Sequence, residues 1–391
     1  DMGRSLADSM IIAGHVSVWL LACWLAVQGL VLFGYGAWRA WALDGDGDTL
    51  TRFVEYTGFR AGAYPNHCVD AQLEGLEYHY CVYPPYALPM FAVFFEPGGL
   101  LQGRILIEVL SFVALVLMGA FGNAMLRRHG AAWGAVGAFA AAAISGNKTV
   151  LNNGQFSLIC MGFILLQIIL LQRGRSLTAG LCWAGAMLKP QIGLAFGAMF
   201  LIQGWWRGLV FGLVLLTVLS LVASWWTDVA PARLVEHWLF EMQMRFAAES
   251  TNFGPAAVAE LLGLDYSILQ YAAFVTLGCL MLSVALVVSR TVGKEQLLPF
   301  AGIGAALGRV LLYHHVYDDI MVFPLLIECL RLALDRRDAL GIASATSVAL
   351  TLWVPHPILR MVPGCGVLQP LIWIVAAVYV GLVTLSRQGA Q

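Results

Sequence analysis

The stretch IIAGHVSVWLLACWLAVQGLVLFGY, residues 11 to 35, decides the fold class of this sequence. It is almost wholly apolar and has the length that a helix needs to cross a bilayer, about 20 residues. The run is too long for the apolar core of a cleaved signal peptide. We therefore interpret it as a retained membrane anchor.

The composition of the whole chain agrees with this first run. Of its 391 residues, 60% are hydrophobic and only 12% are charged, whereas soluble domains carry about 25% charged residues. The sequence therefore predicts an all-α polytopic membrane protein. A formal net charge of −1 excludes a nucleic-acid binder that works through bulk electrostatic attraction.

Apolar runs recur along the chain and predict a bundle of roughly 10–12 transmembrane helices, which we treat as a single integral membrane domain over residues 1–391. The runs lie near 11–35, 105–125, 131–146, 156–172, 177–188, 191–205, 208–225, 266–289, 296–312, 317–334, 339–354 and 367–385. The pair at 177–188 and 191–205 is too short for two full crossings. We expect a hairpin that turns at Pro190, because proline breaks a helix.

The placement of Lys and Arg in short loops predicts the orientation. With a cytoplasmic N-terminus in the plasma (inner) membrane, one set of basic residues falls on the cytoplasmic side: Arg127, Arg128, Arg173, Arg175, Arg207, Arg290, Lys294, Arg331, Arg336 and Arg337. The long polar segments then face the external or periplasmic side. The largest is the first external loop, residues 36–104.

This first external loop opens with three carboxylates, Asp44, Asp46 and Asp48. Two interpretations are open for them: a solvated turn rich in Gly and Asp, or acids placed at the membrane surface for chemistry. Residues 49–61 carry aromatic side chains at helical spacing, which predicts an interfacial helix with its aromatic residues toward lipid. Residues 83–95 form a second short apolar segment. The two segments either flank a groove that leads to Asp48 or belong to an aromatic belt that anchors the loop.

Two of the eight cysteines, Cys68 and Cys81, lie in this loop. On the external side of the membrane such cysteines pair in an oxidising environment, so we predict a disulfide between them. The sequence has no Cys-x-x-Cys motif and no His/Cys cluster with zinc spacing. We therefore predict no metal site.

Several ionisable residues lie within or beside the predicted spans, where charge is costly and usually functional. Lys189 precedes Pro190 in the hairpin, and Arg309 lies in a span shortly before His314 and His315. An alternative is that Arg309 or Lys189 pairs with an aspartate and holds the bundle together. The groups suit glycosyl transfer from a lipid-linked sugar, because a phosphate needs cations beside it and an acceptor hydroxyl needs a carboxylate to take its proton. The candidate cations are Lys148, Lys189, Arg309, His314, His315 and Arg360.

The order of the short motifs resembles a known family. The motifs are Asp48, Gly62, Tyr64-Pro65, Tyr83-Pro84-Pro85, Gly154-Gln155, Arg173-x-Arg175, Leu188-Lys-Pro-Gln191, Asn252 with an apolar run to Gly263, and His315-x-Tyr317-Asp318. This pattern, over about residues 11 to 334, resembles the polyprenol-phosphate-mannose-dependent mannosyltransferases of the GT-C superfamily, typified by the phosphatidylinositol-mannoside α-1,2-mannosyltransferases.

The resemblance implies a GT-C-like fold and an inverting glycosyltransferase that needs neither a nucleotide sugar nor a cofactor. It implies that Asp48 is the general base, that His315 and Lys189 lie near the donor phosphate or sugar, and that Gln155 lines the site. The chain departs from the family where Thr49 follows Asp48 in place of an aromatic residue. The tandem histidines leave open which of them takes the family role.

The sequence thus predicts a membrane enzyme that moves a hexose, mannose first, from a polyprenyl-monophosphate donor to a lipid or cell-envelope glycan acceptor on the external face. Its expected partners are the polyprenyl-phosphate sugar, the acceptor and membrane lipids, with no nucleic acid. A transporter or flippase of a lipid-linked sugar is the alternative, since it also needs buried cations and a lipid portal.

Overall fold

The computed structural model describes residues 2–42, 47–64, 81–96, 98–248, 297–312, 314–362 and 364–386, with short pieces between 272 and 280. All regular elements in this part of the chain are helical, which confirms an all-α polytopic membrane protein. Among the described residues, four helices are long and apolar enough to cross a membrane. They are Ala13–Ala42 within α1 (Met2–Ala42), Gly99–His129 formed by α5 (Gly99–Leu126) with η1 (Arg127–His129), α11 (Trp206–Thr227) and α19 (Cys365–Ser386).

The remaining described helices are shorter. They are α2 (Gly47–Arg60), α4 (Ala87–Phe95), α6 (Ala131–Ala140), α7 (Asn147–Asn153), α8 (Ser157–Gln172), α9 (Ser176–Ala186), α10 (Pro190–Gly197), η2 (Ala198–Gly204), α12 (Pro231–Ala248), α15 (Leu297–Leu311), η4 (Val316–Val322), α16 (Phe323–Arg336), α17 (Ala339–Trp353) and α18 (His356–Leu359).

The number of long spans differs from the 10–12 that the apolar runs predict. Helices α7 and α8 pass the length and composition test only together, with a bend of 118° between them, so the described residues hold up to five candidate spans. Other predicted spans are apolar helices of 10–17 residues, which at about 1.5 Å per residue are shorter than the hydrocarbon core. Several apolar runs that the sequence predicts as full spans thus form shorter helices in the structure. The predicted span at 266–289 lies largely outside the described residues.

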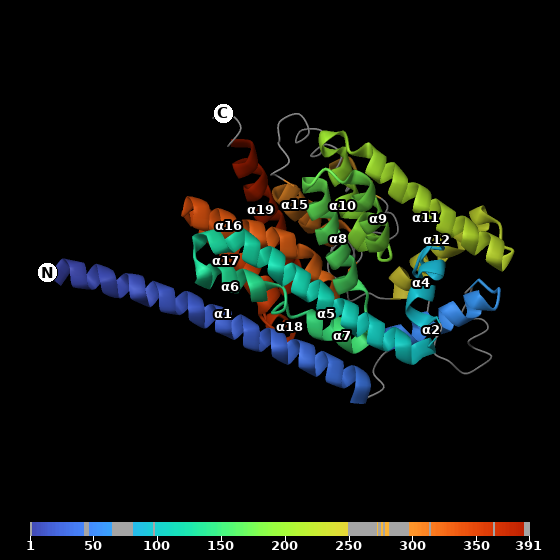
Figure 1. Cartoon of the computed structure of the whole chain (residues 1–391), viewed down its shortest axis with the longest axis horizontal. Helices are drawn as coiled ribbons and strands as arrows, with labels where there is room; N and C mark the ends of the chain where they lie inside the picture. The colour runs from blue at the N-terminus through green and yellow to red at the C-terminus, as the bar shows by residue number, and fades with distance from the viewer. Residues whose placement is uncertain are drawn as a thin grey trace.

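The long helices α1 and α5 run along the long axis of the molecule, with α2 and α4 toward one end and α6, α16 and α17 toward the other (Figure 1). Polar and small side chains join the helices. Gln28 on α1 donates to the carbonyl oxygens of Ala143 and Trp353, both at 2.6 Å. Gly122 on α5 faces Gly137 on α6 so closely that a side chain on either would meet the other backbone. Such small residues let membrane helices approach each other.

Three breaks in the helical path lie together and bring polar residues into the bundle. One follows Gly154, which ends α7; the second precedes Pro190, which starts α10; the third precedes η4. Pro190 occupies the first turn of α10, where a missing N–H costs nothing, and this confirms the predicted break at Pro190. Irregular backbone at such depth is tolerated where it lies within protein or lines a cavity.

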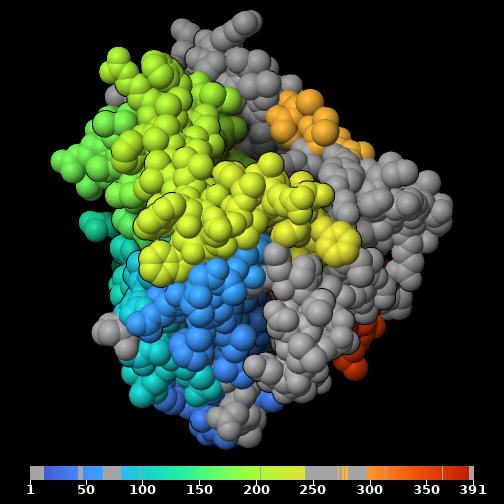
Figure 2. Space-filling model, turned by 90° about the vertical axis from the view of Figure 1, so that its right-hand side faces the viewer, coloured from blue at the N-terminus to red at the C-terminus, as the bar shows by residue number. Residues whose placement is uncertain are grey.

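The predicted interfacial helices exist as α2 and α4, but their aromatic residues do not face lipid. Tyr56 and Phe59 are 5% and 7% exposed, and both Phe53 and Tyr56 lie against Phe95 of α4, with ring centroids 5.6 Å and 5.8 Å apart. The predicted orientation was wrong because α4 and α11 supply partners for this aromatic face. α2 and α4 thus pack on each other directly, and α12 lies beside α2 on the face that Figure 2 shows.

Candidate active site

Asp48 is held near the start of α2 by a residue from another part of the bundle. The Gln155 side-chain amide donates to Asp48 Oδ2. Gln155 reaches it because α7 ends at Gly154 in the left-handed conformation, with φ of 63°, which glycine adopts without strain. A side chain at position 154 would also collide with Thr49. The Gly154-Gln155 pair therefore fixes the carboxylate of Asp48 against the helix break.

Lys189 lies at the centre of this polar cluster. Its Nζ donates to Gln155 Oε1 at 3.0 Å, to Ser157 Oγ at 2.9 Å and to Asp318 Oδ1 at 2.8 Å. A lysine ammonium has three donors, so all are used by the protein. Lys189 is 3% exposed, and a buried charge persists only when it is paired in this way. Lys189 therefore links the three helix breaks.

Asp318, in η4, completes the cluster. Besides Lys189 it accepts from Ser157 Oγ at 2.6 Å, and its second oxygen lies 3.3 Å from His314 Nδ1. That oxygen also accepts from the backbone N–H of His315 at 3.4 Å, which closes the first turn of η4. The hydrogen-bonded chain therefore runs from Asp48 through Gln155 and Lys189 to Asp318 and His314.

A second buried ion pair neighbours this chain. Arg309 Nη2 lies 2.6 Å from Asp319 Oδ1, both side chains are at most 4% exposed, and Gln369 donates to the other oxygen of Asp319 at 3.4 Å. The Arg309 guanidinium lies 5.4 Å from the ring centroid of Trp373. Both Arg309 and Lys189 are thus paired with aspartates, the structural alternative that the sequence left open. Their predicted contact with a donor phosphate stays a prediction.

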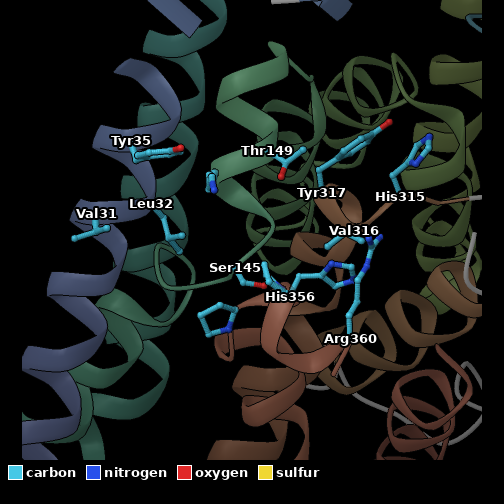
Figure 3. A pocket seen from close by; sticks show the side chains of 13 residues that line it. Val31, Leu32, Tyr35, Ser145, Thr149, His315, Val316, Tyr317, His356 and Arg360 are labelled. Carbon is cyan, nitrogen blue, oxygen red and sulfur yellow. The ribbon is translucent and has the colours of Figure 1, made fainter. Parts of the chain in front are cut away.

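A pocket of about 530 Å³ lies beside these hydrogen-bonded side chains, between α1, α7, η4 and α18 (Figure 3). Its polar lining includes Lys148, His315 and Arg360, while Val31 of α1 contributes an apolar wall. The pocket residue Tyr317 joins it to the polar chain, because Lys189 Nζ lies 4.6 Å from the Tyr317 ring centroid. The structure therefore brings His315 and Arg360 to one pocket.

His356 also lines this pocket but is a poor source of positive charge. Burial, with Arg360 and Arg309 acting in the same direction, lowers the pKa of His356 to about 4. The imidazole is therefore neutral at pH 7 and serves as a hydrogen-bonding group. Lys148 and Arg360 are the fixed cations of the pocket.

A further buried pair lies on the same face of α2 as Asp48. Arg52 and Glu55 follow Asp48 by four and seven positions, which places them one and two helical turns on, and Arg52 Nη1 lies 2.8 Å from Glu55 Oε2. Arg52 also lies 4.6 Å from the ring centroid of Tyr83. Burial raises the pKa of Glu55 to about 7, although Arg52 acts in the opposite direction.

The raised pKa of Glu55 predicts a pH dependence of stability. The folded state binds the Glu55 proton more tightly than the unfolded chain between pH 4.5, the ordinary value, and about 7. The contribution of Glu55 to the free energy of unfolding is therefore largest below pH 4.5, decreases as the pH rises to about 7 and stays constant above that. The total change is on the order of 3 kcal/mol at most. Thermal unfolding of Glu55→Gln in detergent should show a flatter pH dependence than the parent over this window. Equal slopes in both proteins would contradict the prediction.

Some predicted residues are not placed by the structure. Asp44, Asp46 and Cys68 lie outside the described residues, so neither interpretation of the two acids is tested, and the predicted disulfide between Cys68 and Cys81 stays a prediction. Cys81 is buried, and its Sγ lies 3.8 Å from the carbonyl oxygen of Tyr83.

The sequence interpretation missed Ser157 as a member of the site, and it quoted Asp318 in a motif without assigning it a role. Asp318 carried a usable signal, since a carboxylate within an apolar run usually has a buried basic partner. Ser157 had none, because an isolated serine at a helix start is most often a cap. Its role follows only from the position of Lys189.

Comparison with known proteins identifies the family of the chain. Residues 81–313 match the model of Glycosyltransferase family 87. The chain belongs to this family. The matched segment contains Gln155, Lys189 and Arg309, whereas Asp48 and Asp318 lie outside it. No curated protein and no solved structure matches the chain. Membership of glycosyltransferase family 87, together with the long apolar helices, makes the chain an integral membrane glycosyltransferase.

Proposed function

We propose that this family 87 enzyme is an inverting transferase that moves a hexose, mannose first, from a polyprenyl monophosphate to a lipid or cell-envelope glycan acceptor. Asp48 is the general base in this proposal. The observation that carries it is the half-buried Asp48 carboxylate, one oxygen of which is held by Gln155. The other oxygen has no hydrogen-bond partner among the described residues and is available to an acceptor hydroxyl.

The pocket lined by Lys148, His315 and Arg360 suits the phosphate and the prenyl tail of the donor. Lys148 and Arg360 supply fixed positive charge, and His315 adds a ring next to Tyr317, with centroids 4.8 Å apart. The wall formed by α1 includes Val31, which is 60% exposed on the outer surface of the helix. A prenyl chain can therefore leave the pocket along an apolar surface while its phosphate stays beside the cations.

The reaction balances with these groups. The acceptor oxygen bonds to the anomeric carbon while the bond from that carbon to the phosphate oxygen breaks on the opposite side. The acceptor proton passes to Asp48, and the polyprenyl monophosphate leaves with the electron pair. Cations beside the leaving phosphate stabilise its developing charge. Lys189 acts as a positioning residue in this scheme, since its three donors are spent on Gln155, Ser157 and Asp318.

Reconstitution tests the proposal. The purified protein in vesicles should transfer radiolabelled mannose from polyprenyl-phosphate mannose to a lipid or glycan acceptor, and should not use GDP-mannose in the absence of the lipid donor. NMR of the product should show an inverted anomeric configuration. Transfer from the nucleotide sugar alone would overturn the donor class. Movement of the lipid-linked sugar across the bilayer without a new glycosidic bond would favour the flippase alternative. The membrane and orientation predicted from Lys and Arg placement, with the site on the external face, belong to the same proposal.

A further inference from the structure

An apolar groove of about 510 Å³ lies on the outer surface of the bundle, between α1, α6, α16 and α17. All but two of its lining residues are apolar, the exceptions being Arg337 and Thr346. Two of these lining residues, Trp24 of α1 and Leu350 of α17, are 46% and 55% exposed, so the groove opens on the outer surface, where the hydrocarbon of a bilayer would surround a spanning bundle. Its size falls within the roughly 300–1,000 Å³ of ligand pockets.

The groove lies far from Asp48 but borders the pocket with Lys148, since Val354 lines the groove and the next residue, Pro355, lines the pocket. The walls of the groove belong to α6, α16 and α17, which Figure 1 places toward the opposite end of the long axis from α2 and α4. None of its lining residues belongs to the polar chain from Asp48 to His314 or to the pocket with Lys148. The groove is therefore a separate surface from the proposed phosphate pocket, and its own cation is Arg337 rather than Lys148 or Arg360.

Arg337 provides a charge at one end of this apolar surface. It follows α16 directly and adopts the left-handed conformation, with φ of 55°, which costs energy for any residue other than glycine. Among the described residues its guanidinium has no carboxylate partner. The three acids in this region are engaged by other arginines: Arg128 with Asp335 at 2.6 Å, Arg331 with Glu328 and Asp335, and Arg336 with Asp338 at 2.9 Å.

We propose that this groove binds an anionic glycerophospholipid, with an acyl chain along the apolar walls and the phosphate on Arg337. The charge selects the occupant. A guanidinium forms paired hydrogen bonds with phosphate oxygens. In the described part of this region, five arginines face three carboxylates; the arginines are Arg127, Arg128, Arg331, Arg336 and Arg337. Basic residues at the ends of membrane helices attract anionic headgroups. A zwitterionic lipid such as phosphatidylcholine also presents a phosphate, but its choline ammonium cancels that charge and is repelled by the surrounding arginines.

The test compares two lipids that share acyl chains and differ in net charge. The full chain, purified in detergent, is titrated with phosphatidylglycerol or phosphatidylcholine, with thermal unfolding and native mass spectrometry as readouts. Phosphatidylglycerol should raise the Tm of the parent by about 3 °C or more and remain bound, because a ligand of the folded state stabilises it by mass action. Phosphatidylcholine should bind at least about 10-fold more weakly and should raise the Tm by less. Inorganic phosphate alone should give no shift.

Two variants, each with a matched control, separate the phosphate contact from the groove. Arg337→Asn keeps a residue that tolerates the left-handed backbone, so it should fold, and it should bind both lipids equally. Arg336→Gln changes a neighbouring arginine that is already paired with Asp338, and it should keep the preference for phosphatidylglycerol. Thr346→Trp fills the groove and should abolish retention of both lipids, while Ala343→Trp, which is exposed on α17 but does not line the groove, should not. Equal binding of the two lipids by the parent, or an unchanged preference in Arg337→Asn, would overturn the proposal. So would retention of phosphatidylglycerol by Thr346→Trp.

Discussion

Replacing Asp48 with asparagine is expected to lower the rate of glycosyl transfer at least ~100-fold, because a general base contributes about that factor or more. The substitution keeps the shape of the side chain and its ability to accept the hydrogen bond from Gln155, but removes its basicity. Transfer from polyprenyl-phosphate mannose measures the rate. Donor retention on the purified variant measures binding, which should persist because the pocket with Lys148 and Arg360 is unchanged.

Asp228→Asn is the matched control for this substitution. Asp228 is exposed at the end of α11 with φ of 52°, a conformation that asparagine also adopts, so neither rate nor Tm should change. Near-normal turnover in Asp48→Asn would rule out Asp48 as the base. If Asp44→Asn or Asp46→Asn abolished transfer instead, the base would belong to one of those two acids.

The sequence predicts the fold class and the positions of several helices well, but it does not predict which neighbours their side chains face. The all-α membrane class follows from composition alone, and the break at Pro190 follows from the chemistry of proline. The interfacial helices were found at nearly their observed bounds, because aromatic residues recur at helical spacing. Which way these aromatic residues face was not predictable, since the periodicity of α2 shows that one side is apolar but does not show whether lipid or α4 covers it.

The same limit applies to the candidate site. Lys189, Gln155 and Asp48 each carried a local signal, but their mutual hydrogen bonds depend on three helix breaks that meet in space. A buried cation is readily found in an apolar run. Whether it faces a substrate or a carboxylate of its own chain depends on tertiary packing, and the assignment of Arg309 to Asp319 needed the structure.

Replacing Lys189 with methionine is expected to lower both stability and activity. Lys189 and Asp318 are at most 3% exposed, and removal of one partner leaves a buried charge uncompensated at a cost of roughly 3–5 kcal/mol. The variant also loses the contact that holds Gln155 against Asp48. Thermal unfolding and transfer rate should therefore both decrease, and a single variant cannot separate the two causes.

The double variant Lys189→Met with Asp318→Asn makes that separation. It removes the uncompensated charge, so most of the lost stability should return, while the transfer rate should stay at least ~10-fold below the parent because Gln155 is no longer positioned. The comparison pair is Arg309→Met with Asp319→Asn, which removes the neighbouring buried ion pair but leaves the hydrogen bonds from Asp48 to Lys189 intact. It should be as stable as the first double variant, and its transfer rate tests the predicted contact of Arg309 with the donor phosphate. Recovery of full activity by the Lys189 and Asp318 double variant would show that Lys189 serves only to neutralise Asp318. Continued inactivity in a stable protein would show that the hydrogen-bonded chain acts through Asp48.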